Sequence, residues 1–162
     1  MIRKLRFLCF AVLVCVALKS QAQTVHLLSL DQLEKRFQQG KDTVYVVNFW
    51  ATWCAPCIKE LPIFKKLQSS YASEPLKVLL VSIDLKSKLD KVVNPFVRRN
   101  KLANELFLLN EANEKKYIDR ISTTWSGALP ATLVFNKENN IRRFYQKELS
   151  YSELEEIYKL AQ

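Results

Sequence analysis

The chain has 162 residues, of which 49% are hydrophobic and 25% are charged, with two glycines and five prolines. This composition predicts one globular domain and excludes a disordered or collagen-like chain. Two glycines cannot supply the Gly-rich loop of a dinucleotide or phosphate site. The single histidine, His26, argues against zinc, copper or haem sites built from imidazoles and against a Ser/His/Asp triad. Four cysteines are therefore the candidate chemistry.

The N-terminal segment, 1–22, has the pattern of a secretory signal peptide. Residues 1–6 carry three basic side chains, residues 7–18 form an apolar run, and residues 20–22 (Ser-Gln-Ala) place small side chains at a cleavage site. A retained membrane anchor is the alternative, but the run is shorter than the roughly 20 apolar residues that span a bilayer. We expect a signal peptide over 1–22, a domain over 23–162, and a periplasmic or secreted location.

Cleavage after Ala22 changes both the charge and the cysteine content. It leaves 21 Lys and Arg against 16 Asp and Glu, a net charge of +5. We expect this surplus to be scattered over a solvated surface, and we expect no nucleic-acid-binding face. Cys9 and Cys15 are removed, so Cys54 and Cys57 remain.

The chain after Ala22 begins as alternating helices and strands. Ser29 and Gln32 can form a capping box for a first helix, which Gly40 is placed to end. Residues 43–49 and 76–83 are apolar and rich in β-branched side chains, which predicts two strands buried on both faces. A helix between them implies a right-handed crossover and a parallel pair of strands. That helix has Pro62 in its interior, and its apolar face is spaced as Ile58, Leu61, Phe64, Leu67 and Tyr71.

The second half continues the pattern of an α/β domain, with no internal repeat or linker. Its end predicts a hairpin, closed by a turn over 136–140, and then an amphipathic helix. The predicted elements are a helix over 94–99, a strand over 106–109, a helix over 111–121, strands over 131–135 and 141–145, and a helix over 151–161 with Leu154, Ile157, Tyr158 and Ala161 inward.

The two remaining cysteines lie where the first buried strand passes into a helix, in Trp53-Cys54-Ala55-Pro56-Cys57. We call residues 53–57 the cysteine turn. Free N–H groups and the positive dipole end at a helix start stabilise a thiolate, so Cys54 is the predicted nucleophile. Cys57, one turn further, is placed to attack a mixed disulfide on Cys54 and release the partner. Pro56 is tolerated because no donor is needed in the first turn.

Other uses of a Cys-x-x-Cys pair fit less well. A structural disulfide across so small a ring constrains little chain entropy. A zinc site needs two further ligands, and outside the pair the chain after Ala22 offers no cysteine and only His26. Covalent haem attachment needs a histidine directly after the second cysteine, where Ile58 stands.

Two segments resemble the thioredoxin superfamily, and within it the exported TlpA/ResA-like thiol-disulfide oxidoreductases. One runs from Asn48 to Cys57 and continues in residues 60–62 (Glu-Leu-Pro), and the other, residues 125–132, resembles the loop whose cis-proline faces the cysteines. The resemblance extends from about Leu30 to the C-terminus. It implies a thioredoxin-like α/β fold, a central mixed sheet flanked by helices, with an inserted segment before the cis-proline loop.

The resemblance also implies roles for residues outside the cysteine pair. Pro130 is expected to be cis, which exposes the backbone of Leu129 to an extended segment of a partner. Glu60 is expected to accept the thiol proton during exchange, because Asn48 stands where cytoplasmic thioredoxins carry a buried aspartate. Trp53, Pro56 and Leu129 are placed at the partner-binding surface.

Four side chains receive a structural interpretation. We expect Trp50 and Trp53 to pack around the cysteine turn and Trp125 to pack against the inserted segment. Asp84, at the end of the second strand, is interpreted as a cap of the next helix.

These observations predict an exported monomer that exchanges a Cys54–Cys57 dithiol or disulfide with protein thiols and disulfides and needs no cofactor or metal. The resemblance implies a reductant, fed by a membrane electron donor, for apocytochrome c or other exported clients. Peroxide reduction is disfavoured because Ala51 stands where a peroxidatic cysteine is preceded by threonine. A copper-delivery module would need a downstream histidine, and a redox-inert binding module would not need the intact cysteine turn.

Overall fold

The computed structural model describes residues 23–111 and 113–162. The predicted signal peptide, with Cys9 and Cys15, lies outside the described residues. Within the part of the chain that is described, no helix has the length and apolarity needed to cross a bilayer.

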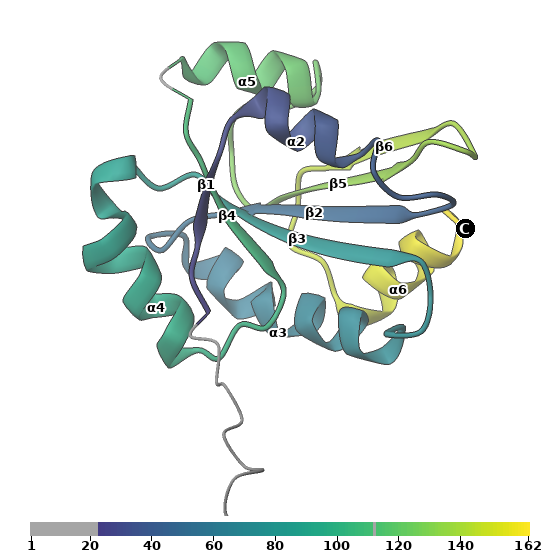
Figure 1. Cartoon of the computed structure of the whole chain (residues 1–162), viewed down its shortest axis with the longest axis horizontal. Helices are drawn as coiled ribbons and strands as arrows, with labels where there is room; N and C mark the ends of the chain where they lie inside the picture. Colours follow the sequence, from purple (N-terminus) through teal and green to yellow (C-terminus); the bar gives the residue numbers. More distant parts are fainter. Residues whose placement is uncertain (1–22, 112) are drawn as a thin grey trace, which may run out of the picture.

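A six-stranded mixed sheet forms the centre of the molecule, in the order β1-β4-β3-β2-β5-β6 (Figure 1). The pairs from β1 to β2 are parallel, and β5 is antiparallel to both β2 and β6. The parallel β2-β3 pair is the one that the strand-helix-strand pattern predicts. The strands are β1 (His26–Leu28), β2 (Val44–Trp50), β3 (Leu76–Ser82), β4 (Glu105–Leu109), β5 (Ala131–Asn136) and β6 (Ile141–Tyr145).

Helices cover both faces of the sheet, so each face has its own apolar core (Figure 1). On one face lie α3 (Ala55–Ser70), α4 (Asn94–Arg99) and α6 (Tyr151–Lys159), and on the other lie α2 (Leu30–Arg36) and α5 (Glu114–Ile121). Two helical turns, η1 (Lys86–Lys88) and η2 (Leu89–Val93), lead into α4. This architecture confirms the expected thioredoxin-like fold.

The near-continuous apolarity of β2 follows from these two cores. Val44 and Val46 belong to the core under α3, while Tyr45 and Val47 belong to the core under α2 and α5. Every residue of β2 is buried, and in β3 only Lys77 is exposed. The sequence pattern of a strand buried on both faces was therefore a correct guide to the sheet centre.

Several element boundaries differ from the sequence prediction. The capping box of Ser29 and Gln32 is present, but α2 ends at Arg36, before Gly40. Gly40 instead allows its backbone to lie close to the Thr43 side chain, since a Cβ at residue 40 would lie 2.2 Å from the Thr43 Oγ1 atom. Helix α5 begins at Glu114 because Asn113 caps it. The short strand β1 and the turns η1 and η2 were not predicted.

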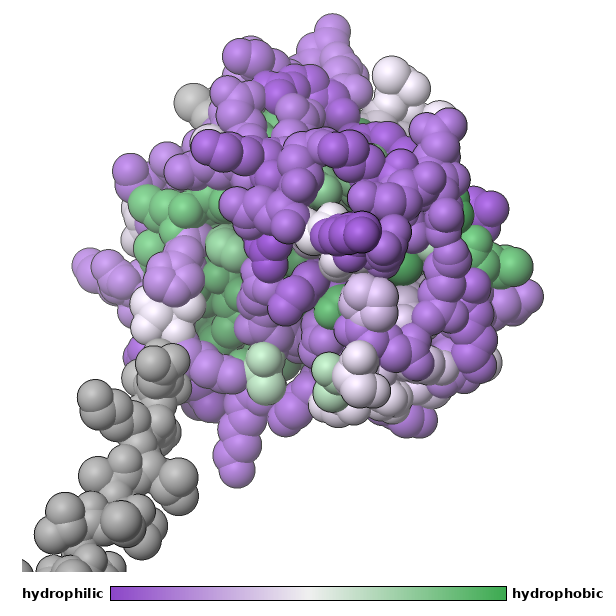
Figure 2. Space-filling view, turned by 45° about the vertical axis from the view of Figure 1, so that its right-hand side comes forward, coloured by the Kyte–Doolittle hydropathy of each residue, from purple (hydrophilic) through white to green (hydrophobic). Residues whose placement is uncertain are grey.

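The two outer strands are short, and the surface is largely polar. β1 has three residues and β6 has five, with Arg142 and Arg143 exposed on β6. The Arg142 guanidinium donates to the backbone carbonyls of Arg120 and Ile121, at 3.2 and 2.9 Å, where α5 ends. Hydrophilic residues cover most of the face in Figure 2, and apolar residues gather in a smaller area at its left.

Candidate active site around the Cys54–Cys57 disulfide

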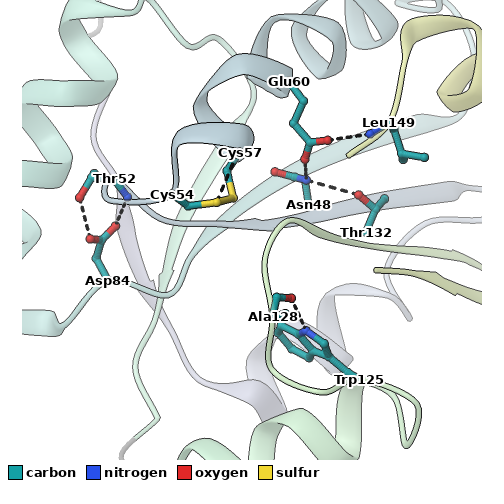
Figure 3. The surroundings of a disulfide bond; sticks show 10 residues. All are labelled: Asn48, Thr52, Cys54, Cys57, Glu60, Asp84, Trp125, Ala128, Thr132 and Leu149. Atoms are coloured by element: carbon teal, nitrogen blue, oxygen red, sulfur yellow. Dashed lines mark hydrogen bonds between the residues drawn. A yellow bond between two sulfur atoms is a disulfide. The ribbon is translucent and has the colours of Figure 1, made fainter. Parts of the chain in front are cut away.

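Cys54 and Cys57 form a disulfide across the first turn of α3 (Figure 3). Cys54 is the N-cap residue, and its Sγ accepts a hydrogen bond from the Cys57 N–H at 3.3 Å. The exposed fraction is 6% for Cys54 and zero for Cys57. Cys54 is therefore the sulfur that a partner can reach, and a thiolate there would face the unpaired N–H groups of the helix start.

Asp84 holds the turn that leads into the cysteines (Figure 3). Its carboxylate accepts from the Thr52 N–H at 2.9 Å, from the Thr52 hydroxyl at 2.7 Å and from the Ser82 hydroxyl at 2.8 Å. The interpretation of Asp84 as a helix cap was wrong, because Leu85 is the N-cap residue of η1 and makes no side-chain cap bond. Asp84 instead ties the end of β3 to the segment between β2 and Cys54.

The Leu129–Pro130 peptide bond is cis, as the resemblance implies. Pro130 directly precedes β5, whose Ala131 pairs with Phe49 of β2. Trp125 supports the loop, since its indole N–H donates to the Ala128 carbonyl at 2.9 Å. The ring of Trp125 also packs on Tyr117 of α5.

A buried polar network lies on the other side of the disulfide from Asp84 (Figure 3). The Asn48 Nδ2 group donates to Glu60 Oε1 at 2.8 Å and to Thr132 Oγ1 at 3.3 Å. The Leu149 N–H donates to Glu60 Oε2 at 3.0 Å. Glu60 is 2% exposed and Asn48 is fully buried, so this carboxyl is no solvated helix residue. The network joins β2, α3, β5 and the segment before α6.

Burial sets the protonation behaviour of Glu60. Removal from water raises the pKa of Glu60 from 4.5 to about 7, although the hydrogen bonds from Leu149 and Asn48 act in the opposite direction. The charge of Glu148 contributes to this rise. A carboxyl with a pKa near neutrality can both accept and release a proton at physiological pH.

One acceptor of this network has no partner. Among the described residues, no donor reaches the buried Asn48 Oδ1 atom. In Figure 3 this oxygen lies on the side of the amide that faces the disulfide. An unpaired buried acceptor next to a disulfide is one of the few groups that a newly formed thiol could use.

A hollow of about 540 Å³ adjoins the cysteine turn on its Trp53 side. Trp53 is 68% exposed and Leu85 is 71% exposed, so both present apolar surface to it. The expectation that Trp53 packs around the turn was wrong, whereas Trp50 is buried and its ring lies 5.3 Å from that of Phe96. The hollow is lined by Trp53, Ile83, Asp84, Leu85, Lys86, Leu109, Asn110, Glu111, Glu114, Tyr117 and Gly127.

The structure thus brings most of the predicted site residues together at one end of the sheet. Pro56 is exposed in the first turn of α3, and Leu129 is half-buried between the two cores. Sequence reasoning did not assign Asp84 and Leu85 to the site, although both lie within three residues of the end of β3. Within residues 23–111 and 113–162, no group of three or more His, Cys, Asp or Glu side chains is placed to hold a metal ion.

A Cys-x-x-Cys disulfide at a helix start, on a thioredoxin-like sheet with a cis-proline before β5, places the chain among the thioredoxin-like thiol-disulfide oxidoreductases. More particularly, the chain belongs to the AhpC/TSA family, whose model matches residues 18–144. Ala51, three residues before Cys54, has no hydroxyl to offer to a peroxide.

Comparisons with individual proteins agree with this class. The chain is 29% identical over 136 residues to the thioredoxin-like protein YneN of Bacillus subtilis, covering 84% of this chain and 75% of that protein. It is 26% identical over 129 residues to the thiol-disulfide oxidoreductase ResA of Geobacillus thermodenitrificans, covering 79% and 68%.

Solved structures show the same fold. A thioredoxin-related protein from Neisseria meningitidis serogroup B superposes with a TM-score of 0.66 at 26% identity, over 76% of this chain and 88% of that one. StoA from Bacillus subtilis superposes with a TM-score of 0.58 at 23% identity, over 74% and 84%.

Proposed function

We propose that this protein is an exported reductant of protein disulfides, that its signal peptide is cleaved near Ala22, and that it works outside the cytoplasm as a monomer. The disulfide at the start of α3, in which Cys54 is 6% exposed and Cys57 is fully buried, is the observation that carries the proposal. Relatives named thiol-disulfide oxidoreductases support the reaction type.

In the reduced protein, the Cys54 thiolate attacks one sulfur of a client disulfide. A mixed disulfide forms between Cys54 and the client, and the other client sulfur leaves as a thiolate. The free N–H groups at the start of α3 stabilise the attacking thiolate. The backbone of Leu129 and the exposed Trp53 and Pro56 border the place where the client segment lies.

In the second step, Cys57 resolves the mixed disulfide. Its thiol loses a proton, the thiolate attacks the Cys54 sulfur, and the second client thiolate leaves. Two electrons pass to the client, and the Cys54–Cys57 disulfide closes. Glu60 takes the proton, because its buried carboxyl lies one helical turn from Cys57 and has a pKa near neutrality.

Asn48 takes part in the proton step in two ways. Its amide nitrogen donates a hydrogen bond to Glu60, and its amide oxygen accepts one from the Cys57 thiol. Its amide nitrogen binds the Glu60 carboxylate at 2.8 Å, which leaves the Asn48 Oδ1 atom free. In the reduced protein, the Cys57 S–H group donates to this oxygen. Asn48 then satisfies the buried thiol before its proton leaves, as buried polar groups require.

The proposed direction is reduction, with electrons supplied by a membrane donor and delivered to exported clients such as apocytochrome c. The names of the relatives, thiol-disulfide oxidoreductases, support thiol-disulfide exchange, and the direction and the clients are part of the proposal. The reduction potential of the purified protein tests the direction. We expect a value near or below the roughly −270 mV of thioredoxin, and a value near the roughly −120 mV of strong oxidants would overturn it.

A trapping experiment tests the clients and the order of attack. With Cys57→Ser, the mixed disulfide on Cys54 cannot be resolved, so exported client proteins should be recovered covalently bound. Cys54→Ser should trap none. If Cys54→Ser traps clients and Cys57→Ser does not, the assignment of attacking and resolving sulfur is reversed.

A further inference from the structure

The net charge of the domain comes from one segment. Residues 23–162 carry 21 Lys and Arg and 16 Asp and Glu, and six of these cations but only one of these acids lie in residues 86–101. The remaining residues carry 15 of each and are neutral. The expectation of a scattered surplus was therefore wrong. We call this segment the basic segment, and its cations are Lys86, Lys88, Lys91, Arg98, Arg99 and Lys101.

These cations are available to a partner. All six are exposed, and among the described residues none of them forms an ion pair. The one acid of the segment, Asp90, accepts a hydrogen bond from the Asn94 side chain at 3.1 Å. Lys65 of α3 adds a further cation beside the segment, since its Nζ donates to the Lys101 carbonyl at 3.1 Å.

The basic segment lies where the described chain begins. The Val25 N–H donates to the Asn94 Oδ1 atom at 3.0 Å, inside the core. In Figure 1 the start of the described chain runs beside α4, whose first residue is Asn94. The preceding sequence, residues 1–22, contains the apolar run 7–18 and Lys19. The basic segment therefore lies at the end of the domain to which residues 1–22 are joined before cleavage.

We propose that the basic segment is a docking surface for a bilayer that contains anionic phospholipids. A cluster of four to eight exposed cations on a domain is attracted by the phosphate groups of such a bilayer. The contacts come from residues 86–101, so docking needs no retained anchor. An acidic protein is a less suitable occupant, because a protein interface needs an apolar centre and the exposed side chains of the segment are mostly cations.

Docking would also orient the active site. The basic segment starts at Lys86, which lines the hollow beside Trp53, and Phe96 packs on Trp50 at the end of β2. The edge of the cysteine turn would then lie close to the bilayer. A membrane electron donor could reach the disulfide there without the protein leaving the surface.

Vesicle partition tests the proposal on the protein as it is recovered from expressing cells, with the N-terminus those cells leave on it. The probes are vesicles of pure phosphatidylcholine and vesicles that mix two parts of phosphatidylcholine with one part of phosphatidylglycerol. The measured quantity is the ratio of the two partition coefficients, so any apolar contribution of the N-terminus cancels. We expect the ratio to exceed ten in about 50 mM salt and to fall towards one at about 0.5 M, because salt screens the attraction.

Two variants with the same loss of charge locate the surface. The first carries Lys88→Gln, Lys91→Gln, Arg98→Gln and Arg99→Gln, and the matched control neutralises four other exposed lysines. Each cation that reaches an anionic surface contributes about fivefold to binding, so we expect the first variant to lose at least tenfold and the control little. The control substitutions are Lys41→Gln, Lys115→Gln, Lys116→Gln and Lys137→Gln.

Three results would overturn the proposal: no preference of the wild type for anionic vesicles, equal losses in the two variants, or tighter binding to soluble polyglutamate than to vesicles at equal charge concentration. The last would indicate an acidic protein partner. Circular dichroism confirms that both variants are folded. Reduction of a small soluble disulfide should be equal in all three proteins, which separates this test from that of the redox function.

Discussion

Glu60→Gln removes the buried carboxyl beside the disulfide and keeps both the size of the side chain and an oxygen that can accept from Leu149. In the folded protein the pKa of Glu60 is raised to about 7, because burial disfavours the charged form. The folded state then binds the proton more tightly than the unfolded state, where the ordinary pKa is 4.5. This contribution to stability is complete below about pH 4.5 and is lost as the pH rises through 7.

The difference between these two pKa values corresponds to about 3 kcal/mol in the free energy of unfolding. Urea unfolding of the oxidised protein at pH 4.5 and pH 8.5 measures it. We expect the wild type to lose about 3 kcal/mol more than Glu60→Gln between these values. The control is Glu156→Gln, an exposed carboxyl on α6, which should follow the wild type. If Glu60→Gln keeps the pH dependence of the wild type, the buried carboxyl is not the group that titrates.

The remaining predictions concern Asp84, the exposed Trp53 and the N-cap residue of α6, Ser150. Asp84→Ala leaves the Thr52 N–H without its acceptor, and should lower the free energy of unfolding by about 2–4 kcal/mol in urea; a loss under about 1 kcal/mol would contradict the role of Asp84. Trp53→Ala should change the free energy of unfolding by less than about 0.5 kcal/mol. It should slow the reduction of a protein disulfide several-fold more than the reduction of oxidised glutathione. Equal slowing of the two reactions would show that Trp53 is not part of the partner-binding surface. Ser150→Ala breaks the capping box of α6 and should cost about 1 kcal/mol in thermal unfolding, with Ser152→Ala as the control.

The elements that the sequence predicts well are those whose pattern is decided locally. Strands β2 and β3 read as buried because cores on both faces require apolar residues at every position. The capping box of Ser29 and Gln32 and the inward face of α6 depend on residues three or four apart. The cysteine pair belongs to the same group, since its place at the start of α3 follows from β2 and the helix pattern.

The features that were missed depend on contacts between distant residues. β1 is too short to carry a pattern and exists because His26–Leu28 pairs with β4, in the other half of the chain. The role of Asp84 depends on Thr52, which lies 32 residues earlier. The burial of Glu60 depends on Leu149, 89 residues later. Nothing in the spacing along the chain records these three contacts, because the fold alone brings their members together.

The outer strands of the sheet bear on how copies of the protein behave at high concentration. An unpaired strand edge is a template for the edge of a neighbour, and short or charged edges resist such growth. The outer strand β1 has only three residues. The outer strand β6 carries the guanidinium groups of Arg142 and Arg143, and that of Arg142 is hydrogen-bonded to the end of α5. Neither edge therefore favours growth of the sheet from one copy of the protein into the next.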